Sequence, residues 1–394
     1  MKESLFNYRF EYENQKYIFN TNNNGLIQIN NDIFTEEERE YLRVNRFWVD
    51  DNEDEIALLE REINHNIQKR QKELELTIAL TNYCNFSCVY CYQNKNEKLM
   101  TTEVANMIIE KIDRILNDNK FEGINIHYFG GEPLLNIPVL IYLDENIKKI
   151  TDKIGIVYKA FLTTNGSMLS KELLQKVKFS SIQLTFDGLE KTHDRLRVSD
   201  HFHFKEEIEL IENIMNFSQA KVLLRTNICK ENKDEIIALH KYIFEKFGNE
   251  RIEINPNRTI KYHQDDSFEM LSVQEYAEVA YQIKLLWSEQ KGKFELPVPR
   301  STPCKFPYGN AYAISPEGYC TFCSGSMDQE KKYFFDVDIE NKKMFSVRKE
   351  CKKCNILPLC LGGCIIQYNL RAGACTYEKY ELKNILISYI KHIF

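Results

Sequence analysis

The sequence contains no long apolar stretch and no excess of basic residues. None of its apolar runs approaches the roughly 18 residues that identify a membrane-spanning helix, so we expect no membrane partner. The first residues, MKESLFNYRFEYENQKY, carry acidic side chains where a secretory signal has an apolar core, and we therefore expect a cytoplasmic protein. The net charge of −6 provides no basic surface of the kind that nucleic acid requires.

Cysteine is absent from residues 1–72 and concentrated further along the chain. Three of the 12 cysteines lie within 84–91, eight lie within 304–375, and Cys229 stands alone. In a reducing compartment disulfides are rare, and clustered cysteines more often bind metal. We therefore predict metal centres in two separate parts of the chain and read Cys229 as an ordinary buried thiol.

Residues 1–72 are predicted to form an N-terminal domain. Three strand-like stretches, NYRFEYEN, KYIFNTN and GLIQIN, are separated by turns rich in Asn and Gly. A helix should begin at Thr35, because Glu38 three residues later completes a capping-box pattern. A second, heavily charged helix is predicted over roughly 53–72.

The middle of the chain, residues 73–300, alternates apolar strands with amphipathic helical segments. The predicted strands cover 75–81, 123–129, 155–162, 181–186, 221–227 and 251–255. Such alternation indicates an α/β fold with a parallel sheet and helices on its outer face. Six repeats without a change of pattern favour a partial (β/α)6 TIM-like barrel, in which the chemistry lies in the loops after the strands.

Four unusual motifs follow four successive predicted strands. The cysteine loop begins at Cys84, GGEP occupies 130–133, TTNG occupies 163–166, and Asp187 precedes Gly188. Because the carboxyl ends of parallel strands meet at one edge of a barrel, we expect all four motifs on the same face.

The cysteine loop, TNYCNFSCVYCYQ, spaces its thiols as C-x3-C-x2-C. A structural zinc site uses four protein ligands, and this loop offers three. Cysteine thiolates at close spacing also hold iron–sulfur clusters. Three thiolates on a four-iron cube would leave one iron open to a cofactor or substrate. A zinc site or an accidental cluster of thiols is the alternative.

These motifs together resemble the radical S-adenosylmethionine (SAM) superfamily over roughly residues 75–290. The resemblance implies a cluster on Cys84, Cys88 and Cys91 that gives one electron to SAM, so that a 5′-deoxyadenosyl radical takes a hydrogen atom from the substrate. It implies that the GGEP backbone receives the methionyl amino group, with Glu132 suited to the ammonium, and that Tyr90 lies by the adenine. The implied SAM-binding residues are Tyr90, Gly130, Gly131, Glu132, Pro133, Thr164, Asn165, Asp187 and Arg225. FDGLEKTHDRLR (186–197) is similar to a "DG…HD..R" segment of that family, and a charged helix start is the plainer interpretation.

The cysteines of residues 301–380 resemble the SPASM pattern, which carries two auxiliary [4Fe–4S] clusters. With the SAM-binding cluster this makes three. The resemblance implies that the nearer auxiliary cluster is held by Cys304, Cys323 and Cys364, with Cys320 as a possible fourth ligand. It implies that the farther one is held by Cys351, Cys354, Cys360 and Cys375. The run from 351 to 364 alone would also suit a zinc knuckle. A C-terminal helix is expected over 381–394.

Two acidic residues, Asp265 and Asp266, follow the sixth predicted strand. That position makes them candidates for a catalytic base or a substrate contact. A solvated loop is the competing interpretation. His127, at the end of a strand, is read as a structural residue.

The family resemblance implies a substrate that is a peptide or a protein. We expect a maturase that forms a thioether or other cross-link (sactipeptide or ranthipeptide type) in a ribosomally made precursor with a leader sequence. A flavodoxin or ferredoxin is expected to supply its electrons. The N-terminal region is similar to a winged-helix element that grips leader peptides by strand addition, although it could only cap the barrel. An anaerobic sulfatase-maturating enzyme, which makes formylglycine from Cys or Ser, is the alternative. A non-catalytic iron–sulfur or zinc scaffold that binds peptides is a third.

Overall fold

A computed structural model describes the protein over residues 1–29, 34–93, 95–118, 121–248, 251–261, 268–321, 323–326, 332–337, 344–365 and 375–393. The chain divides into two compact units. The first unit contains residues 1–69, 272–304 and 343–394. The second unit contains residues 70–271 and 305–342.

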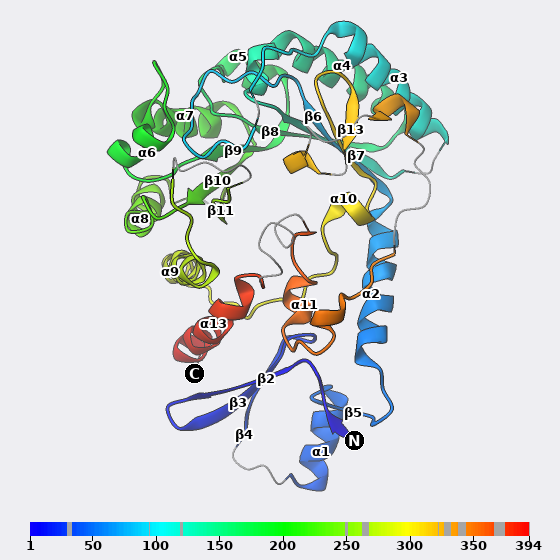
Figure 1. Cartoon of the computed structure of the whole chain (residues 1–394), viewed down its shortest axis with the longest axis vertical. Helices are drawn as coiled ribbons and strands as arrows, with labels where there is room; N and C mark the ends of the chain where they lie inside the picture. Colours follow the sequence, from blue (N-terminus) through cyan, green and yellow to red (C-terminus); the bar gives the residue numbers. More distant parts are fainter. Residues whose placement is uncertain are drawn as a thin grey trace. The chain divides into compact units, whose positions relative to one another are not determined.

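The second unit is built on a nine-stranded sheet (Figure 1) with the order β11-β10-β9-β8-β7-β6-β12-β13-β14. Its central strands are β6 (Glu73–Ala79), β7 (Gly123–Phe129), β8 (Val157–Thr163), β9 (Phe179–Thr185), β10 (Lys221–Ile228) and β11 (Ile252–Arg258). All six run parallel in chain order. The predicted α/β fold with six parallel strands is therefore confirmed.

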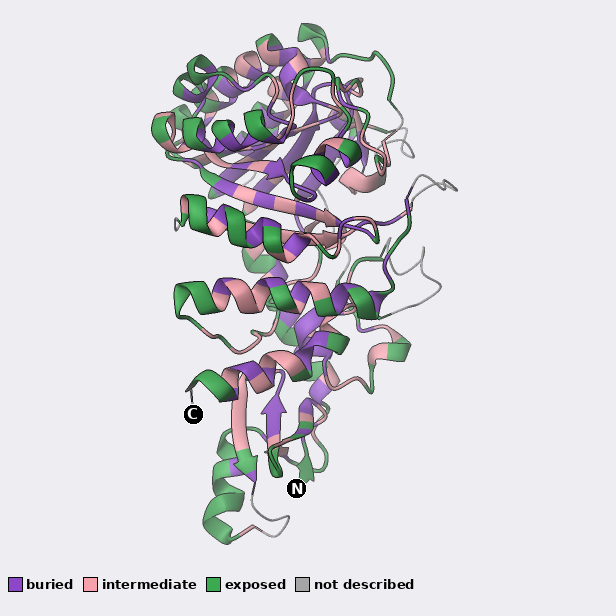
Figure 2. Ribbon diagram, turned by 90° about the vertical axis from the view of Figure 1, so that its left-hand side faces the viewer, coloured by how far each residue is buried: buried purple, intermediate pink, exposed green. Residues whose placement is uncertain are grey.

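Helices follow the strands and lie along the outer face of this sheet, from cyan to green in Figure 1. They are α3 (Thr102–Asp118), α4 (Ile137–Ile154), α5 (Lys171–Lys176), α6 (Glu190–Leu196), α7 (Phe204–Phe217) and α8 (Ile236–Phe247), with the short 3-10 helix η1 (Pro133–Asn136) before α4. Strand side chains alternate between two faces. On β7, Ile126 and Tyr128 are fully buried beneath the helices, whereas His127 on the other face is partly exposed. The strands therefore show both purple and pink bands in Figure 2.

Three further strands extend the sheet beyond β6, and the sequence pattern did not predict them. They are β12 (Ala311–Ile314), β13 (Tyr319–Thr321) and β14 (Lys332–Tyr333), with α10 (Lys305–Tyr308), η2 (Ser324–Ser326) and η3 (Phe334–Asp336) around them. β12 pairs with β6 in parallel, and Lys305 Nζ donates to Glu75 Oε2 at 2.7 Å. The first part of the cysteine-rich region thus completes the edge of the barrel sheet.

The first unit gathers segments that are far apart in the sequence. Its strands are β1 (Lys2–Glu3), β2 (Asn7–Tyr12), β3 (Gln15–Asn20), β4 (Gly25–Ile29) and β5 (Trp48–Val49). Its helices are α1 (Glu36–Val44), α2 (Glu55–Arg70), which ends at the boundary between the units, α9 (Val273–Lys291), η4 (Lys349–Cys351), α11 (Leu357–Cys360) and α13 (Glu378–Ile393). β2, β3 and β4 form an antiparallel sheet. The capping box expected at Thr35 is present, since Thr35 and Glu38 exchange hydrogen bonds.

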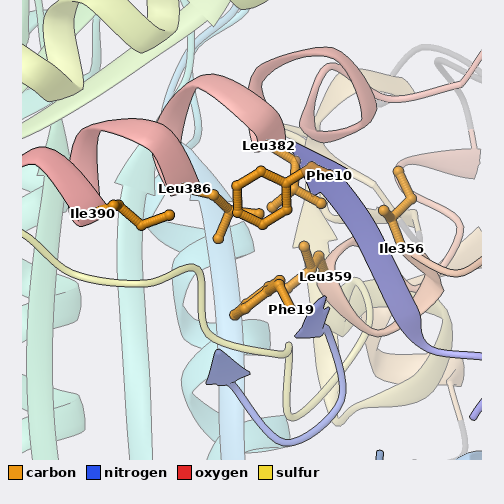
Figure 3. Packing of buried hydrophobic residues seen from close by; sticks show 7 residues of the cluster. All are labelled: Phe10, Phe19, Ile356, Leu359, Leu382, Leu386 and Ile390. Atoms are coloured by element: carbon orange, nitrogen blue, oxygen red, sulfur yellow. The ribbon is translucent and has the colours of Figure 1, made fainter. Parts of the chain in front are cut away.

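One hydrophobic core joins the N-terminal sheet to the last helix and to the segment between two cysteines. It consists of Phe10, Phe19, Ile356, Leu359, Leu382, Leu386 and Ile390, with Cys354 partly buried against it. In Figure 3 the leucines of α13 point toward the two phenylalanine rings. The contact is reinforced by hydrogen bonds, because Asn355 Nδ2 donates to Asn7 O at 3.1 Å and Thr21 Oγ1 donates to Asn355 O. The N-terminal sheet and the 351–360 segment therefore stabilise each other.

Among the described residues, none of the helices is both long and apolar enough to cross a membrane.

We predict that Phe19→Ala will loosen both ends of this shared core. Truncating a fully buried phenylalanine costs about 3–5 kcal/mol, and Phe19 is 0% exposed. Amide hydrogen exchange followed by mass spectrometry should speed up in β2 and β3 and also in α11. Tyr41→Ala, at a residue that is 56% exposed, is the matched control and should change neither. Faster exchange confined to the hairpin would contradict the shared core.

Candidate active site

The glycines of the GGEP motif lie against the backbone of the cysteine loop. Gly130 has a φ of +147°, and a Cβ added there would lie 2.4 Å from Thr81 O. A Cβ on Gly131 would lie 2.1 Å from Tyr83 O. Gly131 N donates to Thr81 O and Glu132 N donates to Tyr83 O, each at 2.8 Å. Only glycine permits this approach, so the two motifs form one backbone platform.

Glu132 joins two loops of this platform and is fully buried. Its Oε1 accepts from Leu134 N at 3.0 Å and Thr164 Oγ1 at 2.6 Å, and its Oε2 accepts from Asn165 N at 2.6 Å. Burial raises the pKa of Glu132 to about 7 despite these donors. These hydrogen bonds give Glu132 a positioning role, because they tie the loop after β7 to the loop after β8. The expected ammonium contact stays a prediction.

The loop after β8 holds the cysteine loop from the other side. Asn165 Nδ2 donates to Asn85 Oδ1 at 2.8 Å, and Asn85 Nδ2 donates to Ser167 Oγ at 2.9 Å. Asn165 Nδ2 also lies 3.9 Å from Cys84 Sγ. Thr164 and Asn165 are thus at the predicted site, whereas Asn85 and Ser167 were not predicted.

The three thiols of the loop are close enough to influence one another. Burial raises the pKa of Cys84 and raises that of Cys88 to about 11, and the neighbouring thiols add to both shifts. All 12 cysteines lie in the described part of the chain, and none forms a disulfide. Among described residues no three His, Cys, Asp or Glu side chains are grouped as around one metal ion. Three thiols that form no disulfide within one short loop are a donor set that an iron–sulfur cluster takes.

Tyr90 and Asp187 meet beside this loop. The Tyr90 hydroxyl donates to Asp187 Oδ2, and Asn227 N donates to Asp187 Oδ1 at 2.7 Å. Asn232 Nδ2 holds the Asp187 carbonyl at 2.9 Å. The Tyr90 ring packs edge-on against Phe268. The pair links the loops after β6, β9 and β10, which is a connection that the sequence motifs alone did not indicate.

The remaining predicted SAM-binding residues lie further around the platform. Pro133 is buried at the first position of η1. Arg225 is on β10, in register with Thr185 on β9, and its Nε donates to Asn227 Oδ1 at 2.8 Å. Gln93 was not predicted, and its Nε2 donates to Gly130 O at 2.9 Å. Its place two residues after Cys91 was the only available signal.

The four cysteines expected to hold the farther auxiliary cluster line one cavity of the first unit. The cavity measures about 580 Å³ and is lined by Cys351, Cys354, Cys360 and Cys375 together with Tyr8, Arg348 and neighbouring residues. Burial raises the pKa of the Cys360 thiol to about 11. Four thiols around a space of this size suit a four-iron cube.

The other predicted ligands are divided between the units. Cys304 and Cys364 are exposed residues of the first unit. Cys320 is buried in β13 and Cys323 is half-buried just beyond it, both in the second unit. Asp265 and Asp266 lie outside the described residues. The assignment of the nearer cluster and of a catalytic base therefore stays a prediction.

The sequence profile of the Radical SAM superfamily matches residues 78–243. The radical SAM cyclopropyl synthase TigE of Paramaledivibacter caminithermalis is 24% identical over 380 residues, which cover 85% of this chain and 78% of TigE. Three other curated relatives match over shorter parts, and the chain spans 39%, 50% and 52% of their length.

Solved structures share the fold at low identity. Native anSMEcpe with bound AdoMet and Cp18Cys peptide superposes with a TM-score of 0.64 at 18% identity, covering 81% of this chain and 99% of that chain. Streptococcus suis SuiB bound to precursor peptide SuiA superposes with a TM-score of 0.54 at 16% identity, covering 93% and 96%.

Gly131→Ala should displace the cysteine loop. The new methyl group would collide with the Tyr83 carbonyl, and a shift of about 1 Å in a positioned group costs roughly 100-fold in rate. We expect a comparable loss of SAM cleavage, measured as 5′-deoxyadenosine. The control is Gly155→Ala, where φ is +82° but nothing lies within 4 Å of the new atom. It should cost about 1–2 kcal/mol of stability and leave cleavage intact. Equal activity in both variants would argue against the platform.

The buried carboxyl of Glu132 should make stability depend on pH. Its folded-state pKa of about 7 lies above the ordinary 4.5, so the unfolded chain releases this proton first as pH rises. Stability conferred by the protonated group is complete below pH 4.5 and lost by pH 7, a change of about 3 kcal/mol. Urea unfolding of the parent and of Glu132→Gln should diverge across that interval. If the free energy of unfolding changes with pH in the same way for both proteins, the raised pKa of Glu132 is contradicted.

Proposed function

Since residues 78–243 form a radical SAM domain, we propose that this protein is a radical SAM enzyme that removes a hydrogen atom from a ribosomally made precursor peptide. The observation that carries the proposal is the backbone platform, in which the three-cysteine loop and the GGEP motif are held together by glycine contacts and by Glu132. SAM and an iron–sulfur cluster, when bound, supply the electron and the 5′-deoxyadenosyl group for this chemistry.

The residues of the platform have separable tasks. Cys84, Cys88 and Cys91 would hold the cluster by three thiolates and leave one iron for SAM. The GGEP backbone and the Asn165 loop would orient the cofactor's amino acid end, and Tyr90 would flank its adenine. His127 on the barrel's inner face has its pKa lowered to about 4 by burial, and its Nε2 lies 2.8 Å from Thr163 Oγ1. This neutral pair would present a polar but uncharged wall to the substrate.

Two observations support a peptide as substrate. Both solved structures named above were determined with peptides bound. In addition, the first unit presents a three-stranded antiparallel sheet in which β2 and β4 are the outer strands. An extended leader peptide could add to such an edge, where backbone hydrogen bonds give affinity and side-chain pockets give selectivity.

We further propose that the product is a thioether or another cross-link, and that two auxiliary clusters and a flavodoxin or ferredoxin serve the electron flow. The cavity lined by Cys351, Cys354, Cys360 and Cys375 supports the farther cluster. Formylglycine formation in a sulfatase is the second candidate. The turnover experiment below separates it from cross-link formation.

The test is anaerobic turnover. Reconstituted protein should contain roughly twelve irons per chain. With SAM, dithionite and the short peptide encoded beside its gene, it should form 5′-deoxyadenosine and change the mass of that peptide. A loss of two hydrogens would indicate a cross-link, and tandem mass spectrometry would locate it.

Replacement of Cys84, Cys88 and Cys91 by Ala should abolish SAM cleavage and leave roughly eight irons per chain. Persistent 5′-deoxyadenosine formation in this variant would contradict the cluster assignment. Conversion of a sulfatase-derived Cys peptide to formylglycine, with no change in the precursor, would establish the second candidate. A parent protein with zinc and no SAM cleavage would be a scaffold.

A further inference from the structure

A network of buried charges lies directly behind the cysteine loop, and the proposed chemistry does not use it. Its members are Asp187 after β9, His193 in α6, Arg197 at the end of α6, and Glu207 in α7. They are 0%, 2%, 6% and 0% exposed, respectively. Burying ionisable side chains is costly unless they are paired, so these four in one place call for a reason beyond helix capping.

The backbone places Arg197 opposite a predicted cluster ligand. Ser87 N donates to Val198 O at 2.8 Å, and Val89 N donates to Leu196 O at 3.0 Å. These two hydrogen bonds flank Cys88 on one segment and Arg197 on the other. The end of α6 is therefore fixed to the middle of the cysteine loop, independently of any bound cofactor.

The guanidinium of Arg197 lies beside the Phe86 ring of the cysteine loop. Its Cζ lies 5.4 Å from the centre of the Phe86 ring. The carboxyl groups that act on it electrostatically are those of Glu207 and Asp187. Its Nε has no hydrogen-bond partner among the described residues. Arginine keeps its charge at any ordinary pH, so a permanent positive charge faces the Cys88 side of the loop.

The other members of the network have contacts of their own. His193 Nε2 lies 3.1 Å from Glu207 Oε2, and the Asp187 carboxylate is held by Tyr90 and Asn227. Charges separated by low-dielectric protein interact more strongly than charges in water. The positive charge of Arg197 therefore acts strongly on a group bound by the thiolates. An equal charge on the solvent-exposed side of α6 would be screened by water and salt.

We propose that Arg197 is a positioning residue that sets the reduction potential of the iron–sulfur cluster held by Cys84, Cys88 and Cys91. Reduction adds one negative charge to the cluster, and the adjacent guanidinium stabilises that added charge. Net charge and surroundings are established determinants of cluster potentials. Arg197 thereby makes the electron transfer that precedes SAM cleavage more favourable.

The decisive comparison is between Arg197→Gln and Arg195→Gln. Both remove one positive charge from α6, but Arg195 is exposed. The midpoint reduction potential of the cluster is measured by anaerobic redox titration in the absence of peptide. The signal followed is the EPR signal that changes when SAM is added. For Arg197→Gln we expect the equilibrium constant for one-electron reduction to fall at least tenfold, which corresponds to a midpoint about 59 mV more negative. Arg195→Gln and Arg197→Lys should stay near the parent.

A further variant, Glu207→Gln, should shift the midpoint potential in the opposite direction. It removes a negative charge from the same network, so the midpoint potential should become more positive. A merely structural role for Arg197 predicts no such reversal. If Arg197→Gln retains no iron, the proposal is tested by Glu207→Gln alone. An unchanged or more negative midpoint potential in Glu207→Gln then overturns the proposal.

The inference rests on the cluster assignment of the proposed function, and the two can fail separately. A parent protein with no SAM-responsive signal would refute the proposed function. A parent with that signal, and with the same midpoint in Arg197→Gln, would refute only the role of Arg197.

Discussion

The close approach of two backbones is the constraint on which the site depends. Gly130 and Gly131 leave no room for a side chain between GGEP and Thr81–Tyr83. That contact joins the loop after β7 to the loop after β6, and Glu132 then binds the loop after β8 through Thr164 and Asn165. Three loops thus share one framework, which ties the start of the cysteine loop to the loops after β7 and β8.

The features that the sequence predicted are mainly local ones. The six strands follow from short apolar runs, and the Thr35–Glu38 cap follows from a four-residue pattern. The hydrogen-bond partners of Glu132 were not predicted, because Thr164 and Asn165 come from another loop. The contact between Arg197 and the Cys88 loop lies beyond reach of any local pattern, since the two residues are far apart in the chain. β12 was missed for the same reason, because its partner β6 lies more than two hundred residues earlier.

Charge is also treated differently in separate parts of the second unit. Around Asp187 and Arg197, ionisable groups are buried, and the Asp187 carboxylate accepts hydrogen bonds from Tyr90 and Asn227. On the helices that face solvent, pairs such as Lys148–Asp152 are exposed and contribute little to stability. The free-energy cost of burying charge is therefore concentrated beside the cysteine loop. There the buried charges can act on a group that the loop binds.

The core shared by Phe19 and Leu386 has a consequence for biosynthesis. These residues are roughly 370 positions apart, and at roughly 5–20 residues per second the ribosome needs roughly 20–70 s to make the chain between them. Throughout that interval the first hairpin lacks the helix that covers its aromatic face. The hairpin can therefore complete its hydrophobic core only after the last helix has been synthesised.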